Sequence, residues 1–203
     1  EAIVRNLMLG MKAADKMGKA AMVGYFPDSW GLPRQLPQIL RGFGIRAVVF
    51  GRGYKEDIRE TGVEFRYIGA DGSELPFVFM PGGYINGINL GYVGKWGDPA
   101  AQPFSEERAA TDLVKAIEDL AGLPRSRHLL SMNGGDHERP DPRLSAILDS
   151  VVSEHRAAID RGGIEAYVEA IESSAPGLPE YSGDLSYGRY SYMVHGIVSS
   201  RAF

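Results

Sequence analysis

The chain lacks cysteine and has no long apolar run. None of its 203 residues is Cys, which excludes disulfides and thiolate metal ligands. No apolar stretch approaches the roughly 20 residues that a membrane-spanning helix needs. The first residues do not form a signal peptide, and there is no Asn-x-Ser/Thr glycosylation site. We therefore expect a cytoplasmic protein without a membrane partner.

The sequence also lacks an excess of positive charge. Lys and Arg total 22 against 26 Asp and Glu, which gives a net charge of −4. Such a surface does not attract nucleic acid or anionic membranes, so we expect no nucleic-acid partner. A chain of this length forms one domain that buries roughly 70% of the surface of its unfolded form.

Strand and helix signals alternate along the chain. Apolar residues recur at helical spacing from Ile3 to Ala14, ahead of Gly18 as a C-cap. Residues 20–23, 45–50 and 127–132 are predicted to form strands. Further helices are predicted over 35–43, over 105–121 with Ser105 as N-cap, and over 164–173, while 174–183 is predicted to be a loop. Another helix is predicted from Pro142 to the glycines at 162–163, with Val152 and His155 on its inner stripe. The pattern predicts an α/β fold with a mostly parallel β-sheet or barrel and outer helices.

One segment interrupts this alternation. Residues 63–68 and 75–79 flank Asp71-Gly72, a strong hairpin signal. We interpret the hairpin as an insertion on the α/β scaffold. The stretch 81–103 that follows is rich in glycine and contains Tyr84, Tyr92 and Trp96. It matches neither a phosphate loop nor a dinucleotide fingerprint, and it is typical both of a sugar-contacting lid and of a disordered surface loop.

Two aspartates follow predicted strands. Asp28 lies in the stretch 24–33, where Pro27 fixes one backbone dihedral and Gly31 and Pro33 keep the chain from continuing directly into a helix. Such a turn holds the carboxylate still. Asp136 follows two glycines that let the backbone approach a ligand closely. Parallel strands would place both carboxylates on one rim, as glycoside cleavage requires. From residue type alone, a helix-capping Asp28 and a turn residue Asp136 remain open.

An arginine follows the strand predicted at 45–50. Arg52 lies between Gly51 and Gly53, where a ligand could sit. An arginine between two glycines is more often simply solvated.

Three segments together resemble glycoside hydrolase family 38, the class II α-mannosidases. Residues 27–45, Pro-Asp-Ser-Trp-Gly-x-Pro-x-Gln-x-Pro-Gln-Ile-Leu-x-Gly-Phe-Gly-Ile, resemble the nucleophile segment of that family. Asn133-Gly134-Gly135-Asp136-His137 resembles its acid/base segment, and Gly183-Asp184-Leu185 with 196–201 resembles its closing segment. The resemblance covers nearly the whole chain. It implies that 1–203 is a fragment of a seven-stranded, barrel-like catalytic domain, without the N-terminal strand and the C-terminal helical and β domains.

The resemblance implies a retaining, zinc-dependent α-mannosidase that acts on mannose-containing oligosaccharides or glycosides through a covalent glycosyl-enzyme intermediate. It implies that Asp28 is the nucleophile and Asp136 the acid/base. Trp30, which replaces a Phe common in the family, and Arg52 would contact the sugar. A non-catalytic sugar-binding remnant, or a metal-dependent sugar deacetylase on a similar barrel, are the alternatives.

The zinc site implied by the resemblance is incomplete in this sequence. Asp28 would be one ligand, but the family's His-x-His-x-Asp segment has no counterpart in residues 1–24. For the remaining ligand we predict His195, with Tyr192 in its place in another register and His137 as the alternative imidazole. With so few ligands, this chain alone should bind zinc weakly or not at all. An unpaired strand edge should make the chain associate with the remaining segments or with itself.

Overall fold

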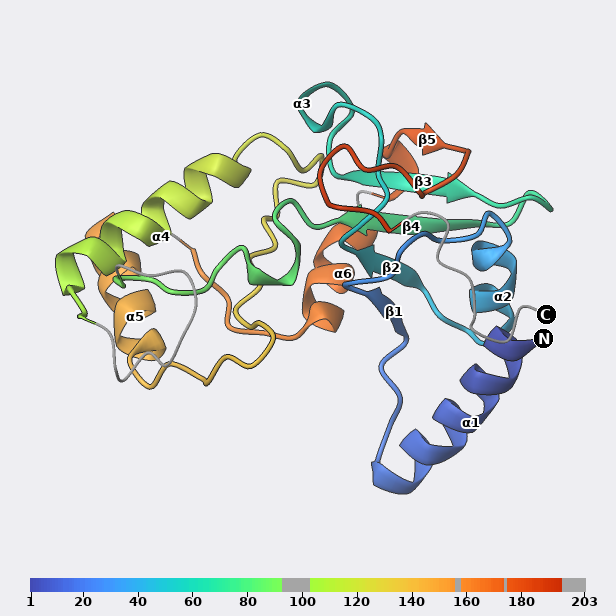
Figure 1. Cartoon of the computed structure of the whole chain (residues 1–203), viewed down its shortest axis with the longest axis horizontal. Helices are drawn as coiled ribbons and strands as arrows, with labels where there is room; N and C mark the ends of the chain where they lie inside the picture. Colours follow the sequence, from blue (N-terminus) through green and yellow to red (C-terminus); the bar gives the residue numbers. More distant parts are fainter. Residues whose placement is uncertain (93–102, 156–157, 174, 195–203) are drawn as a thin grey trace.

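A five-stranded sheet lies at the centre of the part of the chain that the computed structural model describes, residues 1–92, 103–155, 158–173 and 175–194 (Figure 1). Its strand order is β1-β2-β4-β3-β5. Three neighbouring pairs are parallel and β3–β4 is antiparallel. The predicted α/β class with a mostly parallel sheet is therefore confirmed. The strands are β1 (Val23–Phe26), β2 (Ala47–Phe50), β3 (Glu64–Ile68), β4 (Glu74–Phe79) and β5 (Glu180–Tyr181).

Most helices form where periodicity and capping residues predict them, but the helix predicted from Pro142 to 162–163 spans only Leu144–His155, and residues 158–163 form no helix. Ser105 begins α4, because its hydroxyl accepts a hydrogen bond from the Arg108 N–H at 3.2 Å. Gly18 follows α1 with a φ of 132°. Within the described residues, no helix is long and apolar enough to cross a membrane. The helices are α1 (Ala2–Met17), α2 (Leu36–Gly42), α3 (Ile58–Thr61), α4 (Glu106–Leu120), α5 (Leu144–His155) and α6 (Ile164–Glu172), with 3₁₀ turns η1 (Gly83–Ile85) and η3 (Ala175–Gly177).

Both faces of the central strand β2 are buried. Val48 and Phe50 belong to an aromatic-rich cluster on one face of the sheet. Ala47 and Val49 belong to the cluster on the other face, which α6 covers through Val168 and other residues. Because side chains alternate along a strand, a strand covered on both faces is apolar throughout. This explains the uninterrupted apolar run of β2.

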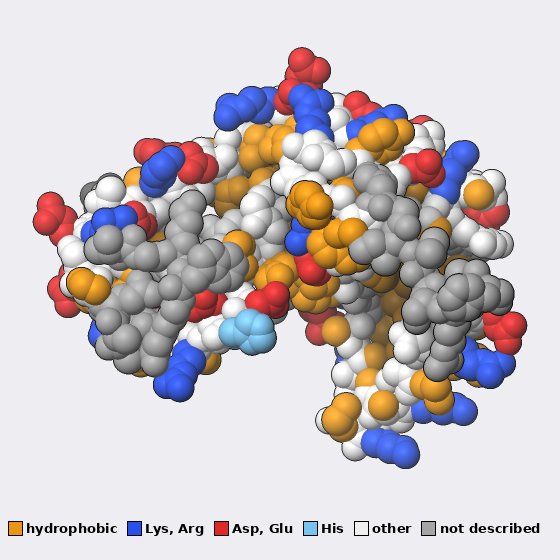
Figure 2. Space-filling model, viewed as in Figure 1, with side chains coloured by type: hydrophobic (Ala, Val, Ile, Leu, Met, Phe, Trp, Pro, Cys, Tyr) orange, Lys and Arg blue, Asp and Glu red, His pale blue; other side chains and the backbone are white. Residues whose placement is uncertain are grey.

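Two parts of the chain lie outside this layered core. Helices α4 and α5 pack on each other and on Leu90 in a cluster of their own, to one side of the sheet (Figure 1). Helix α1 contains no fully buried residue: its Leu7 and Met11 pack against the aromatic-rich cluster, and the helix projects from the body below α2 (Figure 1). Figure 2 shows the surface hollowed into a broad notch between these two parts.

The predicted strand at 127–132 is wrong. These residues form no strand. The backbone of Met132 is instead bound to the turn that follows β4: its N–H donates to Asn86 Oδ1 and its carbonyl accepts from the Gly87 N–H. Because that turn occupies these backbone groups, the segment does not join the ladder.

Several boundaries and roles also differ from expectation. The first strand begins at Val23 rather than at residue 20. The hairpin is not an insertion, because β4 pairs parallel with β2 inside the main sheet. The predicted loop 174–183 contains the short strand β5, which pairs with β3. Val152, predicted to face inward, is 38% exposed. Trp96 and the His155 side chain lie outside the described residues.

Candidate active site

Asp28 lies in the loop that follows β1, two residues after Phe26. This loop packs directly on the end of β2. The Gly51 N–H donates to the Phe26 carbonyl at 3.1 Å, and a Cβ at Gly51 would lie 2.2 Å from the Pro27 carbonyl oxygen. Glycine at 51 is therefore required for the close approach of the loops that contain Asp28 and Arg52.

Arg52 connects the predicted sugar-site residues. It donates through Nε and Nη2 to Asp28 Oδ1, and its Nη1 donates to the Tyr192 carbonyl at 2.8 Å. Its guanidinium carbon lies 4.3 Å from the ring centroid of Trp30. Asp28, Trp30 and Arg52 thus form one group, in which Arg52 is 21% and Asp28 42% exposed.

A segment near the end of the described chain fixes both of these loops. Leu185 is fully buried, and its carbonyl accepts from the Leu32 N–H at 3.1 Å. The Tyr187 N–H donates to the Gly53 carbonyl at 3.0 Å. The segment 185–190 therefore lies against the Asp28 loop and the Arg52 loop together. Sequence reasoning singled out Gly183-Asp184-Leu185 as a motif but did not anticipate this role.

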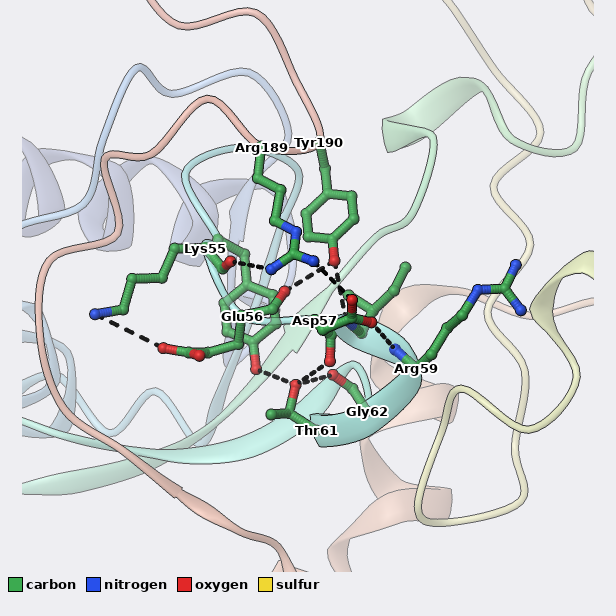
Figure 3. Close-up of polar contacts among 10 residues, drawn as sticks. Lys55, Glu56, Asp57, Arg59, Thr61, Gly62, Arg189 and Tyr190 are labelled. Atoms are coloured by element: carbon green, nitrogen blue, oxygen red, sulfur yellow. Dashed lines mark hydrogen bonds and ion pairs between the residues drawn. The ribbon is translucent and has the colours of Figure 1, made fainter.

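Arg189 and Tyr190, at the end of the same segment, contact residues 56–58 (Figure 3). Arg189 pairs with Asp57 through Nη2 and Oδ2 at 2.6 Å. The Tyr190 hydroxyl donates to the Glu56 carbonyl at 2.9 Å and accepts from the Ile58 N–H at 3.0 Å. These contacts hold the segment 185–190 to the chain between Arg52 and α3.

Asp136 shares a pocket with Asp28. The pocket has a volume of about 380 Å³ and is lined by Tyr25, Pro27, Asp28, Tyr84 and residues 132–136. The Tyr84 hydroxyl donates to Asp136 Oδ2 at 3.2 Å. The two aspartates thus line one pocket, although the strand predicted to deliver Asp136 is absent.

The charges of both aspartates affect the pKa of Tyr84. Burial raises the pKa of its phenol, and the charges of Asp28 and Asp136 raise it further, as does the hydrogen bond to Asp136. The nearby Arg52 guanidinium acts in the opposite direction. A phenol that responds to both aspartates lies within electrostatic reach of each. The sequence placed Tyr84 in an aromatic loop, but only the fold brings it to Asp136.

The residues described here do not fit a zinc ion. Asp28, the predicted ligand, is occupied by Arg52, and no group of three or more His, Cys, Asp or Glu within these ranges could hold a metal. Tyr192 is 79% exposed, and His137 is exposed with a φ of 63°. The predicted ligand His195 lies outside the described residues. Zinc binding to this chain therefore stays a prediction.

Residues 1–184 match the glycosyl hydrolases family 38 N-terminal domain. The chain belongs to glycoside hydrolase family 38. It is 34% identical over 149 residues to the putative mannosylglycerate hydrolase of Halalkalibacterium halodurans. The aligned region covers 68% of this chain and 15% of that protein. The crystal structure of an α-mannosidase from Enterococcus faecalis V583 matches with a TM-score of 0.73 and 25% identity, over 90% of this chain and 20% of that one. The family 38 chain thus spans a fifth or less of the length of these relatives.

Proposed function

We propose that this chain supplies the carboxyl pair of a retaining α-mannosidase, with Asp28 as the nucleophile and Asp136 as the acid/base. The observation that supports this is the shared pocket of the two aspartates in a family 38 chain. Retaining glycosidases need two carboxyl groups on opposite sides of the scissile bond, one to attack and one to transfer a proton. The substrate class is a mannose-containing glycoside or oligosaccharide.

The reaction proceeds in two steps. Asp28 attacks the anomeric carbon while the glycosidic C–O bond breaks, and Asp136 gives its proton to the departing oxygen. In the second step Asp136, now a carboxylate, takes a proton from water, and the water oxygen displaces Asp28 from the anomeric carbon. Two inversions give mannose with retained configuration.

Three side chains next to the aspartates orient the carboxylates or contact the sugar in this scheme. Arg52 hydrogen-bonds the Asp28 carboxylate and fixes its orientation. The half-exposed Trp30 ring offers an apolar surface to a sugar face. Tyr84 holds Asp136 through its hydroxyl. No step is assigned to zinc, because the described residues do not form a site for it.

A particular mannoside, mannosylglycerate, is a second candidate substrate. The observation that favours it is the name of the relative with 34% identity. Comparing kcat/KM for mannosylglycerate and for neutral α-mannosides, in the full-length protein that contains this chain, would decide between the two. A preference for mannosylglycerate of about 100-fold or more would make it the substrate, since a site built to hydrogen-bond a substrate group discriminates by at least this much.

The roles of the two aspartates are tested with the full-length protein. Asp136→Ala should cleave an alkyl mannoside about 100-fold or more slowly, because general acid catalysis contributes that much. It should still release a phenol of low pKa in a burst, since such a leaving group needs no proton. Added azide, which needs no base, should then speed turnover and give a mannosyl azide of retained configuration.

Asp28→Ala is the matched comparison. It removes the attacking carboxylate, so every substrate should be lost whatever its leaving group. Equal loss of activated and unactivated substrates in both variants, without azide rescue of Asp136→Ala, would refute the assignment of Asp136.

A further inference from the structure

One side chain, that of Asn86, hydrogen-bonds two residues of the segment that leads to Asp136. Asn86 Oδ1 accepts from the Met132 N–H at 2.6 Å. Asn86 Nδ2 donates to the Pro81 carbonyl at 3.0 Å and to the Leu130 carbonyl at 3.4 Å. One amide therefore joins the turn after β4 to two residues of the segment. Because these residues form no strand, ladder hydrogen bonds do not supply this support.

Neighbouring contacts show how closely the turn and the segment are joined. The Gly87 N–H donates to the Met132 carbonyl at 2.9 Å, and Asn133 Nδ2 donates to the Gly87 carbonyl at 2.7 Å. A Cβ at Gly87 would lie 2.4 Å from Ser131 Oγ and 3.0 Å from the Met132 carbonyl oxygen. A side chain at position 87 would displace the Ser131 hydroxyl and press on the Met132 carbonyl oxygen.

The turn itself is fixed to the sheet that also places Asp28. It begins at Met80, a buried residue directly after β4, whose N–H donates to the Phe50 carbonyl at 2.9 Å. The Gly83 N–H then donates back to the Met80 carbonyl at 2.9 Å. β4 pairs with β2, and β2 with β1, the strand before Asp28. Asn86 therefore connects the segment before Asp136 to the same sheet that places Asp28.

We propose that Asn86 is a positioning residue for the acid/base: its amide holds residues 130–132 so that Asp136 lies across the pocket from Asp28. This inference rests on the proposed function, which assigns the acid/base role to Asp136. An amide suits the task because it donates and accepts together. Alanine would leave the Met132 N–H without this partner, and aspartate would place a carboxylate against two carbonyl oxygens.

The test uses the dependence of the rate on the leaving group in the full-length protein. A misplaced acid matters only when the departing oxygen needs a proton. For Asn86→Ala we expect kcat/KM on methyl α-mannoside to fall about 100-fold, the size of effect that a displacement near 1 Å produces. On 2,4-dinitrophenyl α-mannoside the first step should change by less than about threefold, because this phenolate leaves without a proton.

Asn86→Asp is the second variant, and it keeps the acceptor for the Met132 N–H. It should show the same selective loss to a smaller degree, and it replaces Asn86→Ala if that variant does not fold. Asn6→Ala, which truncates an exposed amide on α1, is the matched control and should leave both substrates unchanged.

The outcomes separate this inference from the proposed function. A selective loss in both Asp136→Ala and Asn86→Ala supports the positioning role. If Asp136→Ala shows the selective loss and the folded Asn86 variants lose both substrates equally or neither, Asn86 does not position the acid. If Asp136→Ala itself shows no selectivity, the assignment of Asp136 falls, and the positioning role falls with it.

Discussion

At the scale of single residues, Arg52 makes the most demanding set of contacts in the candidate site. It binds Asp28 through two nitrogens, reaches the Tyr192 carbonyl with a third, and lies over the Trp30 ring. Lysine cannot reproduce this, because a single ammonium lacks the planar fork of donors and stacks poorly on an aromatic ring. We therefore expect Arg52 to orient the nucleophile.

The corresponding prediction concerns Arg52→Lys in the full-length protein. Poor orientation of Asp28 should lower kcat/KM about 10- to 100-fold, and by the same factor for activated and unactivated mannosides, since the nucleophile serves both. Arg59→Lys is the control, because the Arg59 side chain is exposed and points away from the contacts in Figure 3. A loss restricted to unactivated substrates would show that Arg52 acts on the acid instead.

The sequence predicted part of this residue-scale arrangement. Asp28 and Arg52 each follow a strand signal, so their meeting at one edge of the sheet follows from parallel pairing. The position of Asp136 was predicted through a strand that does not exist. It reaches the pocket through Asn86 and Gly87, whose contacts with residues 130–133 span more than 40 positions in sequence and leave no local pattern. The catalytic roles of these residues stay predictions.

At the scale of elements, the segment 185–190 fixes the two loops that contain Asp28 and Arg52. Gly53 is the tightest point of this contact. Its φ is 99°, and a Cβ there would lie 2.1 Å from the Leu185 carbonyl oxygen. A methyl group at this position must push the segment away from the Arg52 loop.

Gly53→Ala should therefore destabilise this region much more than backbone strain alone would. The control is Gly72→Ala, because Gly72 also has a positive φ, 83°, but no atom within 4 Å of its Cβ position. Strain alone costs about 1 kcal/mol, so Gly72→Ala should lower the melting temperature only slightly. Gly53→Ala should lower it several times further and open residues 185–190 to proteolysis. Equal shifts in the two variants would mean that the contact at Gly53 adjusts freely.

Elements with local signals were predicted well, and those decided by distant contacts were not. The hairpin was predicted because Asp71 makes its own turn, accepting from the Ser73 N–H at 3.0 Å and from the Ser73 hydroxyl at 2.7 Å. That β4 pairs on its other edge with β2 depends on long-range packing and was missed. The two-residue strand β5 is too short to show any periodicity.

At the scale of the whole molecule, buried tyrosines connect the sheet to the segments around it. Tyr67 is fully buried, and its hydroxyl donates to the Gly183 carbonyl at 2.7 Å. Burial, and then the charge of Asp184, raise the pKa of Tyr67 to about 12. Burial also raises the pKa of Tyr181, and burial together with the Glu64 carboxylate raises that of Tyr167.

These shifts determine how stability depends on alkaline pH. The ordinary pKa of a tyrosine is 10.0, and that of Tyr67 in the folded protein is about 12. Between these values the unfolded chain releases a proton that the folded protein retains, so ionisation favours unfolding. The stabilisation is fully present below pH 10 and is lost as the pH rises through about 12.

Tyr67→Phe should reduce this alkaline loss. At neutral pH the variant should be less stable by about 1 kcal/mol, because one hydrogen bond is gone. Between pH 10 and 12 its melting temperature should fall less steeply than that of the wild type. The variant lacks the Tyr67 phenol, whose proton the folded protein retains and the unfolded chain releases. Tyrosinate absorbance and circular dichroism, followed together in the full-length protein, should show the late phenols ionising only as structure is lost. Tyr192→Phe, at a side chain that is 79% exposed, should leave the slope unchanged. An unchanged slope in Tyr67→Phe, or full ionisation of the phenols before structure is lost, would show that Tyr67 does not resist ionisation in the folded protein.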